Sequence, residues 1–134
     1  MRRTTLCLLF VFLMSFQLLA DNHQQSIHLE QKGGPRDGNP LCFDMPLAYY
    51  CYNSKTQDII IDGNGVVSYY DVEISSPVTN TVEISTQVDG TYDTFDISSL
   101  AAGAHVITIE SPSGNIYEGT FTTYSAVKKA RNLR

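Results

Sequence analysis

Cys42 and Cys51 are the pair of residues whose type and spacing most directly suggest chemistry. In an oxidising compartment, two cysteines that close a loop of about ten residues can form a disulfide that stabilises the fold by about 2 to 3 kcal/mol. Pairing requires Pro46 to fold the intervening segment back on itself. We predict this bond, with two buried or edge thiols as the alternative, because spacing alone does not fix the Cβ geometry that a disulfide needs.

A second group of residues was considered for nucleophilic catalysis. It comprises His105 as a general base, Asp96, and the serines Ser98, Ser99 and Ser111. No Gly-x-Ser-x-Gly elbow surrounds these serines, and a catalytic triad depends on a geometry that adjacency in sequence does not supply. The alternating pattern around His105 instead predicts a histidine that is packed in the core and hydrogen-bonded. We therefore predict that the protein is not an enzyme.

Acidic side chains are numerous enough for a calcium site at one end of the fold to be considered. They are Asp58, Asp62, Asp71, Glu73, Asp89, Asp93 and Asp96. The EF-hand order fails, because Val66 stands where an Asp or Asn ligand is needed. The Asp-Gly pairs at Asp62 and Asp89 are more simply explained as hairpin turns that need positive φ. The three histidines lack the spacing of zinc ligands, so we predict no metal and no cofactor.

The chain has eight tyrosines and no tryptophan. Strand alternation directs about half of the tyrosines outward, where they offer a large contact area at a small entropy cost. We predict an interaction surface for a protein or a glycan. It includes Tyr49 and Tyr69, together with Lys128, Lys129 and Arg131 of the basic C-terminal tail. The alternatives are tyrosines that only stabilise the sheets through cross-strand contacts, and a tail that is solvated and serves solubility.

These side chains must be positioned by strands, because a period of two dominates the hydrophobic pattern in the last third of the chain. Residues 94–98 and 105–110 alternate between apolar and polar side chains. The Pro-Ser-Gly-Asn cluster at 112–115 predicts a tight turn, and residues 117–122 form the strand after it. The inward residues of that last strand are Tyr117, Gly119 and Phe121.

Four earlier strands are predicted. They span residues 47–52, 57–62, 66–75 and 81–87. Tyr70, Val72 and Ile74 are expected to face inward in the third of these strands. Val82 and Ile84 are expected to face inward in the fourth. With the three closing strands this makes about seven short strands and no convincing helix, the pattern of an antiparallel β-sandwich.

A family resemblance is carried by Phe-Asp-Ile-Ser-Ser-Leu at 95–100, then Gly103, then Tyr-x-Gly-x-Phe at 117–121. These motifs resemble an uncharacterised family of small secreted bacterial domains with an immunoglobulin-like β-sandwich fold, catalogued as a domain of unknown function. The similarity is clearest over residues 58–121. The same motifs are similar to the C-terminal sorting modules of some gliding-bacterium secretion systems. His105 departs from both families, which usually have a Tyr or another large hydrophobic residue there. The resemblance implies an immunoglobulin-like fold and secretion, and it implies no substrate.

The first twenty residues have the features of a secretory signal peptide. Arg2 and Arg3 form a basic start, residues 6–13 form an apolar run, and Ala20 is a small residue at the expected cleavage point. The apolar run is shorter than the roughly 20 residues of a membrane-spanning helix, so we expect no membrane span after cleavage. Cleavage leaves 7 basic against 14 acidic residues, a net charge of −7, which argues against nucleic acid as a partner.

With 134 residues, the chain is long enough for one domain with one modest core. The expected parts are a signal peptide (1–20), a flexible N-terminal segment (21–40) that donates one short strand near Ile27, an immunoglobulin-like sandwich (41–124) and a basic tail (125–134). The predicted function is a non-catalytic binding or accessory domain, exported to the periplasm or outside the cell, that contacts a protein or a glycan. The alternative is a secretion or sorting module. Fold alone does not name the partner.

Overall fold

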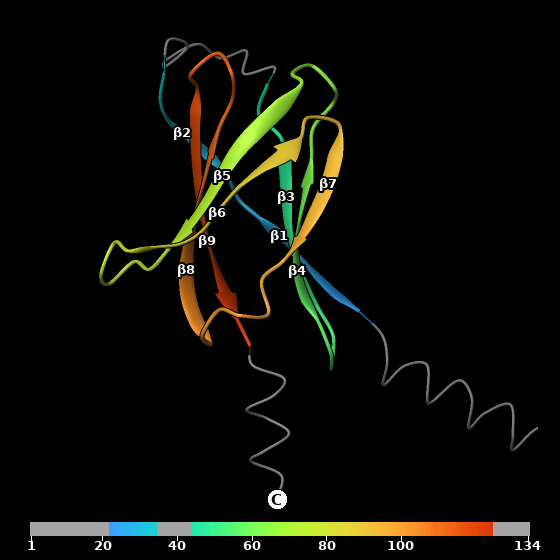
Figure 1. Cartoon of the computed structure of the whole chain (residues 1–134), viewed down its shortest axis with the longest axis vertical. Coiled ribbons are helices and arrows are strands. Elements are labelled where there is room, and N and C mark those ends of the chain that lie inside the picture. Colours follow the sequence, from blue (N-terminus) through green and yellow to red (C-terminus); the bar gives the residue numbers. More distant parts are fainter. Residues whose placement is uncertain (1–21, 35–43, 125–134) are drawn as a thin grey trace, which may run out of the picture.

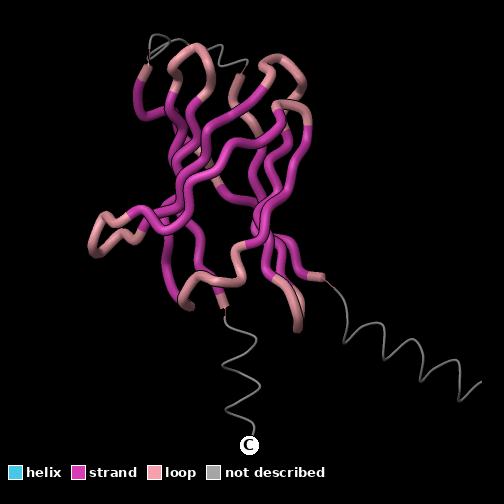
Figure 2. Tube along the Cα trace, viewed as in Figure 1, coloured by secondary structure: helices cyan, strands magenta, loops and turns pink. Residues whose placement is uncertain are grey.

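The computed structural model describes residues 22–34 and 44–124, and within these ranges the chain consists of strands and loops (Figures 1 and 2). The described residues form nine strands. They are β1 (His23–Ile27), β2 (Glu30–Gly33), β3 (Leu47–Tyr52), β4 (Gln57–Asp62), β5 (Tyr69–Ser75), β6 (Val82–Asp89), β7 (Tyr92–Asp96), β8 (Gly103–Glu110) and β9 (Ile116–Thr123). No helix in the described part of the chain is long and apolar enough to cross a membrane.

The nine strands form two sheets that lie face to face (Figure 1). One sheet has the order β1-β3-β4-β7, and the other has the order β2-β9-β8-β5-β6. All pairings are antiparallel. The predicted all-β antiparallel sandwich is therefore confirmed. The bounds of β3 and β4 are those predicted, and Pro46, which cannot donate to a sheet ladder, directly precedes β3.

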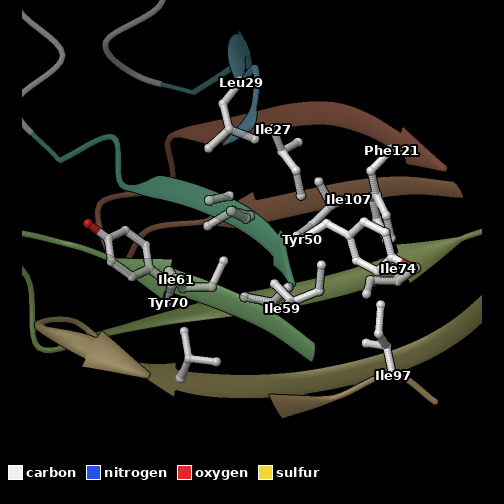
Figure 3. Packing of buried hydrophobic residues seen from close by; sticks show 14 of the residues in the cluster. Ile27, Leu29, Tyr50, Ile59, Ile61, Tyr70, Ile74, Ile97, Ile107 and Phe121 are labelled. Carbon is white, nitrogen blue, oxygen red and sulfur yellow. The ribbon is translucent and has the colours of Figure 1, made fainter. Parts of the chain in front are cut away.

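The core lies between the sheets and is filled by alternate side chains of both (Figure 3). Tyr50, Ile59 and Ile61 reach it from one sheet, and Ile74 and Ile107 reach it from the other. The predicted inward residues of β5, β8 and β9 are all buried. They are Tyr70, Val72, Ile74, His105, Ile107, Ile109, Tyr117, Gly119 and Phe121. The period of two in the sequence thus identified the core face of these strands.

The structure corrects the expected strand count from about seven to nine. The predicted strands correspond to β3 through β9, and the additional ones lie in residues 22–34, within the segment (21–40) that was expected to be flexible with one short strand. β1 pairs with β3 and β2 pairs with β9, so this segment adds one strand to each sheet. Ile27 and Leu29 are buried at the crossover. Hydrophobic periodicity did not reveal β2, because Gln31 is polar. Gln31 is the β2 residue that pairs with the buried Tyr117 of β9.

Gly119 in β9 allows the crossover between β1 and β2 to approach the sheet closely. A Cβ atom at Gly119 would lie 2.5 Å from the His28 carbonyl oxygen and 2.9 Å from Ile27 Cγ2. Any larger residue would push the crossover away, because real Cβ contacts are not that short. A glycine inside a strand often marks such a close backbone approach.

A β-bulge between β5 and β6 overturns the predicted orientation of Val82. Ile74 pairs with Ile84 but Ser75 pairs with Val82, which leaves Glu83 as an extra residue in β6. An extra residue reverses the face on which the preceding side chains lie. Ile84 packs partly buried against the core as predicted, whereas Val82 is 49% exposed and does not face inward.

Candidate functional site

The outer side of the four-stranded sheet carries a group of apolar and aromatic side chains. Tyr49 of β3 lies opposite Ile60 of β4, and in the next row Leu47 and Tyr92 flank Asp62. Side chains directly opposite each other on one face of an antiparallel sheet are about 5 Å apart at Cβ, and diagonal neighbours remain in reach. We call the surface formed by Leu47, Tyr49, Ile60 and Tyr92 the tyrosine face.

Two members of the tyrosine face are strongly exposed. Leu47 is 54% exposed and Tyr92 is 56% exposed, while Tyr49 and Ile60 are half-buried between them and their neighbours. Scattered surface apolar residues are ordinary, but four neighbouring ones on adjacent strands form a patch. The predicted interaction residue Tyr49 is therefore part of a larger apolar surface. Three of its members, Leu47, Ile60 and Tyr92, were not identified from the sequence.

The ionisable residues that flank the tyrosine face on β4 and β7 are acidic. Asp62 lies within it, and Asp58 and Asp96 lie opposite each other two residues farther along the strands. Burial, and then the charge of Asp96, raise the pKa of Asp58. The Ser98 hydroxyl donates to Asp96 Oδ1 over 2.7 Å, which holds the Asp96 carboxylate in place.

Cys51 lies beside this acidic end of the sheet, opposite Asp58. Burial, and then the charge of Asp58, raise the pKa of the Cys51 thiol. Its Sγ lies 3.7 Å from Gln24 Oε1, to which a thiol at this position donates. Cys42 lies outside the described residues, so the Cys42–Cys51 disulfide stays a prediction.

The outer side of the five-stranded sheet has a different character, and we call its group of Asp71, Glu73 and Glu110 the acidic face. Asp71 of β5 lies directly opposite Glu110 of β8, an arrangement of like charges that costs stability. Residues of β5, β6 and β8 surround a shallow hollow of about 450 Å³ there. Tyr69 lies at the end of this side, opposite Asp89.

The predicted interaction residues are therefore not brought together. Tyr49 and Tyr69 lie on the outer sides of different sheets. Lys128, Lys129 and Arg131 of the predicted surface lie outside the described residues. Within residues 22–34 and 44–124 there are twelve acidic residues and two lysines, a net charge of −10. Both outer faces of the sandwich thus belong to a strongly acidic body.

His105 is buried and hydrogen-bonded at both ring nitrogens, as predicted. It is 4% exposed, its Nε2 lies 2.8 Å from the Ala101 carbonyl oxygen, and its Nδ1 lies 2.8 Å from Glu83 Oε1. A carbonyl oxygen can only accept a hydrogen bond, so Nε2 donates to Ala101. The bulge at Glu83 turns this carboxylate toward the ring. Neither ring partner is a serine or a cysteine.

Metal ligands are not gathered in the described part of the chain. No group of three or more His, Cys, Asp or Glu side chains there could hold a metal ion. The seven acids that could have formed a calcium site lie in four strands, β4 to β7, and are divided between the two sheets.

Comparison with known proteins addresses the fold. The chain is similar in structure to a DUF3244 family protein from Bacteroides vulgatus described as having an immunoglobulin-like beta-sandwich fold, with a TM-score of 0.57, 10% sequence identity, and coverage of 76% of this chain and 100% of that chain. The chain has an immunoglobulin-like β-sandwich fold. This confirms the fold that the sequence resemblance implied. No protein-family model matches the chain, and no curated protein matches it. The second resemblance, to secretion-sorting modules, stays a prediction.

A buried carboxylate, that of Asp44, links the two sheets of this immunoglobulin-like sandwich through hydrogen bonds, and we did not predict it from the sequence. Asp44 is 7% exposed and precedes β3 in the four-stranded sheet. Its carboxylate accepts hydrogen bonds from the Tyr117 hydroxyl, the Asn115 amide at 3.0 Å and the Ser113 hydroxyl at 2.8 Å. Its backbone carbonyl accepts a bond of 2.7 Å from the Tyr70 hydroxyl. The network joins Asp44, in the segment before β3, to β5, to β9 and to the turn before β9.

The charge of Asp44 is stabilised by these neutral donors. Burial alone would raise its pKa, but hydrogen bonds from Tyr117, Asn115, Ser113 and Ser111 lower it to about 2. The sequence contained one signal for this network, which is the acidic residue Asp44 within the otherwise apolar run of residues 41–47. An acid that is buried in such a run needs several hydrogen-bond donors. The network links both sheets, and its groups are engaged with one another, so it serves stability.

Proposed function

We propose that the protein is a small exported, non-catalytic domain that binds another protein through the tyrosine face. The observation that carries the proposal is the patch of Leu47, Tyr49, Ile60 and Tyr92 on adjacent strands, which includes two strongly exposed apolar side chains and has carboxylates within it and beside it. Protein interfaces commonly have an apolar, aromatic-rich centre and a polar rim, and tyrosines are frequent among their strongest contacts.

The charge of the rim defines the partner. Asp62 lies within the tyrosine face, Asp58 and Asp96 lie beside it, and the described body has a net charge of −10. Complementary charge favours a partner with lysines or arginines around an apolar centre, and it speeds association at low salt. A glycan can also stack on tyrosines, but an uncharged sugar would gain little from this excess of carboxylates.

Export is supported by the basic start, the apolar run and the small residue at position 20. A binding role without catalysis is supported by the buried ring of His105, which is hydrogen-bonded to a backbone carbonyl and a carboxylate and to neither a serine nor a cysteine. The site of action is the periplasm or the outside of the cell.

The test is site-specific photocrosslinking in living cells with the full chain. A photoreactive phenylalanine analogue replaces Tyr49 or Tyr92 on the tyrosine face, and Tyr69 on the other sheet is the matched control position. We expect the same protein to be crosslinked from positions 49 and 92 and not from position 69. The double variant Tyr49→Ser and Tyr92→Ser should bind that protein about tenfold or more weakly, because interface tyrosines often contribute more than about 1.4 kcal/mol.

A charge-reversal variant, Asp62→Lys, checks the chemistry of the partner. It should weaken binding and reduce its dependence on salt, since one favourable ion contact becomes a repulsion. Equal crosslinking of the same protein from positions 49 and 69 would refute the proposed surface. Binding to a glycan array that is lost in the double tyrosine variant, with no crosslinked protein, would replace the protein partner by a glycan.

A further inference from the structure

Strand β6 forms the longest open edge of the described sandwich. The strands at sheet edges are β1, β2, β6 and β7. β2 has four residues and a register shift, and β1 and β7 have five residues each. β6 has eight residues and pairs only with β5. An open edge is a template on which another chain can add a strand.

The register of β5 and β6 shows which main-chain groups point away from the sheet. The Gly90 N–H donates to the Ser68 carbonyl oxygen over 3.0 Å, which marks a hydrogen-bonded pair. Bonded and non-bonded pairs alternate in an antiparallel ladder, so Ser85, Gln87 and Asp89 direct their N–H and C=O groups to the open side. The Asp89 N–H is already engaged, since it donates to Asp93 Oδ2 over 2.9 Å. The open groups are therefore those of Ser85 and Gln87.

This part of the edge lacks two of the usual protections against strand addition, and the bulge at Glu83 lies just before it. Residues 84–88 read Ile-Ser-Thr-Gln-Val and contain no charged residue and no proline. Edge strands are commonly guarded by charges, prolines or bulges. Glu83 does not guard this edge with its charge, because the bulge turns its carboxylate toward the ring of His105 at 2.8 Å.

The hollow on the acidic face lies beside the open groups. Ser85, Thr86 and Gln87 of β6 contribute to its lining, together with Asp71 and Glu73 of β5. A strand added to β6 would place the side chains opposite Ser85 and Gln87 on the same outer face. These positions are two strand spacings from β5, about 10 Å, which a lysine or arginine side chain and a facing carboxylate span together. The Gln87 side-chain amide donates a hydrogen bond to Asp71 Oδ1 over 3.2 Å. A lysine or arginine of the added strand would replace this neutral donor with a charged one, which makes a stronger hydrogen bond to the carboxylate.

The structure assigns the edge of β6 as a second protein-binding site, separate from the tyrosine face. Its ligand is an extended segment of another protein that adds to β6 as a strand and carries lysine or arginine at alternate positions. Main-chain hydrogen bonds to Ser85 and Gln87 hold the segment, and the carboxylates of Asp71 and Glu73 select its charge.

The test uses a synthetic capped heptapeptide in which lysine and valine alternate, with the full-length protein. Binding is followed by NMR, through amide hydrogen exchange and chemical shifts. We expect exchange at the Ser85 and Gln87 amides to slow about tenfold or more at saturating peptide, as these donors become hydrogen-bonded. A peptide with glutamate in place of lysine should leave both amides unchanged. A lysine peptide methylated on its backbone nitrogens should bind about tenfold more weakly, because it cannot pair with the edge.

Two variants test the protein side. Gln87→Pro removes an N–H that the β5 ladder does not use, whereas Gln87→Ala loses only the side chain and keeps that N–H. The proline variant should therefore bind the peptide about tenfold more weakly than the alanine variant. Asp71→Asn combined with Glu73→Gln should weaken binding and flatten its salt dependence. Equal binding of the methylated peptide, or protection at β1 or β2 instead of Ser85 and Gln87, would overturn the assignment. The peptide comparison decides the matter even if Gln87→Pro does not fold.

Discussion

Replacing Asp44 tests the cross-sheet network most directly. Asp44→Ala removes the acceptor shared by the buried Asn115 amide and Tyr117 hydroxyl and by the Ser113 hydroxyl. Asn115 and Tyr117 are both 0% exposed, and each buried donor that loses an acceptor costs about 1 to 3 kcal/mol. We expect the free energy of unfolding at pH 7 to fall by about 2 to 4 kcal/mol, a large part of the total for a small domain.

The pH dependence of stability should reveal the charge of Asp44. Its folded pKa of about 2 lies below the ordinary value of 3.8, so its contribution is complete above pH 3.8 and is lost as the pH falls toward 2. That contribution amounts to about 2 kcal/mol. The native protein should therefore lose about 2 kcal/mol more than Asp44→Asn between pH 5 and pH 2.

Urea unfolding, followed by far-ultraviolet circular dichroism or tyrosine fluorescence, measures both effects. With a slope of about 2 kcal/mol per M urea, the expected loss at pH 7 lowers the midpoint by about 1 to 2 M. The control is Asp71→Asn, an exposed acid that should change stability by no more than about 0.5 kcal/mol. An Asp44→Ala loss below about 1 kcal/mol, or identical pH profiles for the native protein and Asp44→Asn, would refute this account of the network.

Three other predictions test separate parts of the sandwich. Glu83→Ala should lower the free energy of unfolding by about 1 to 3 kcal/mol, because the buried His105 ring loses an acceptor, and urea unfolding at pH 7 will show whether it does. Gly119→Ala should loosen the crossover between β1 and β2 and speed amide exchange in both strands, whereas Gly33→Ala, where an added Cβ meets nothing closer than 3.9 Å, should leave exchange there unchanged. Burial, and then the charge of Asp44, raise the pKa of Tyr70 to about 12. Tyr70→Phe should therefore remove one ionisation at high pH from the ultraviolet titration of the tyrosines.

The sequence was sufficient for features that depend on local periodicity. Pro46 and the apolar run of residues 59–61 located β3 and β4 to the residue. Alternation predicted the inward faces of β5, β8 and β9, because each of these strands has one apolar side. It also placed His105 in the core. Its partner Glu83 was not predicted, since the bulge that directs its carboxylate inward depends on how β5 and β6 align.

Other features depend on pairings between distant segments. The β2 residue that pairs with the buried Tyr117 is the polar Gln31, so no apolar pattern marks β2 in the sequence. The tyrosine face joins Tyr49 to Ile60 and Tyr92 only through the register of three strands. Asp44 gives no sign of its partners in the sequence, because Asn115 and Tyr117 are far along the chain. These features were not predicted because each depends on strand register or on contacts between distant segments, which no local sequence pattern encodes.

The pairing of β2 with β9 has a consequence for the order in which the protein can fold. Ile27 in β1 pairs with Ala48 in β3, a contact within the first half of the chain, whereas Glu30 in β2 pairs with Glu118 in β9. Closing so long a loop costs more entropy and slows folding. β1 can therefore join its sheet as soon as β3 is available for pairing, but β2 must wait for nearly the whole sequence. A chain that stops before residue 116 would carry β2 without its partner strand, so the N-terminal segment would remain half folded and prone to pair elsewhere.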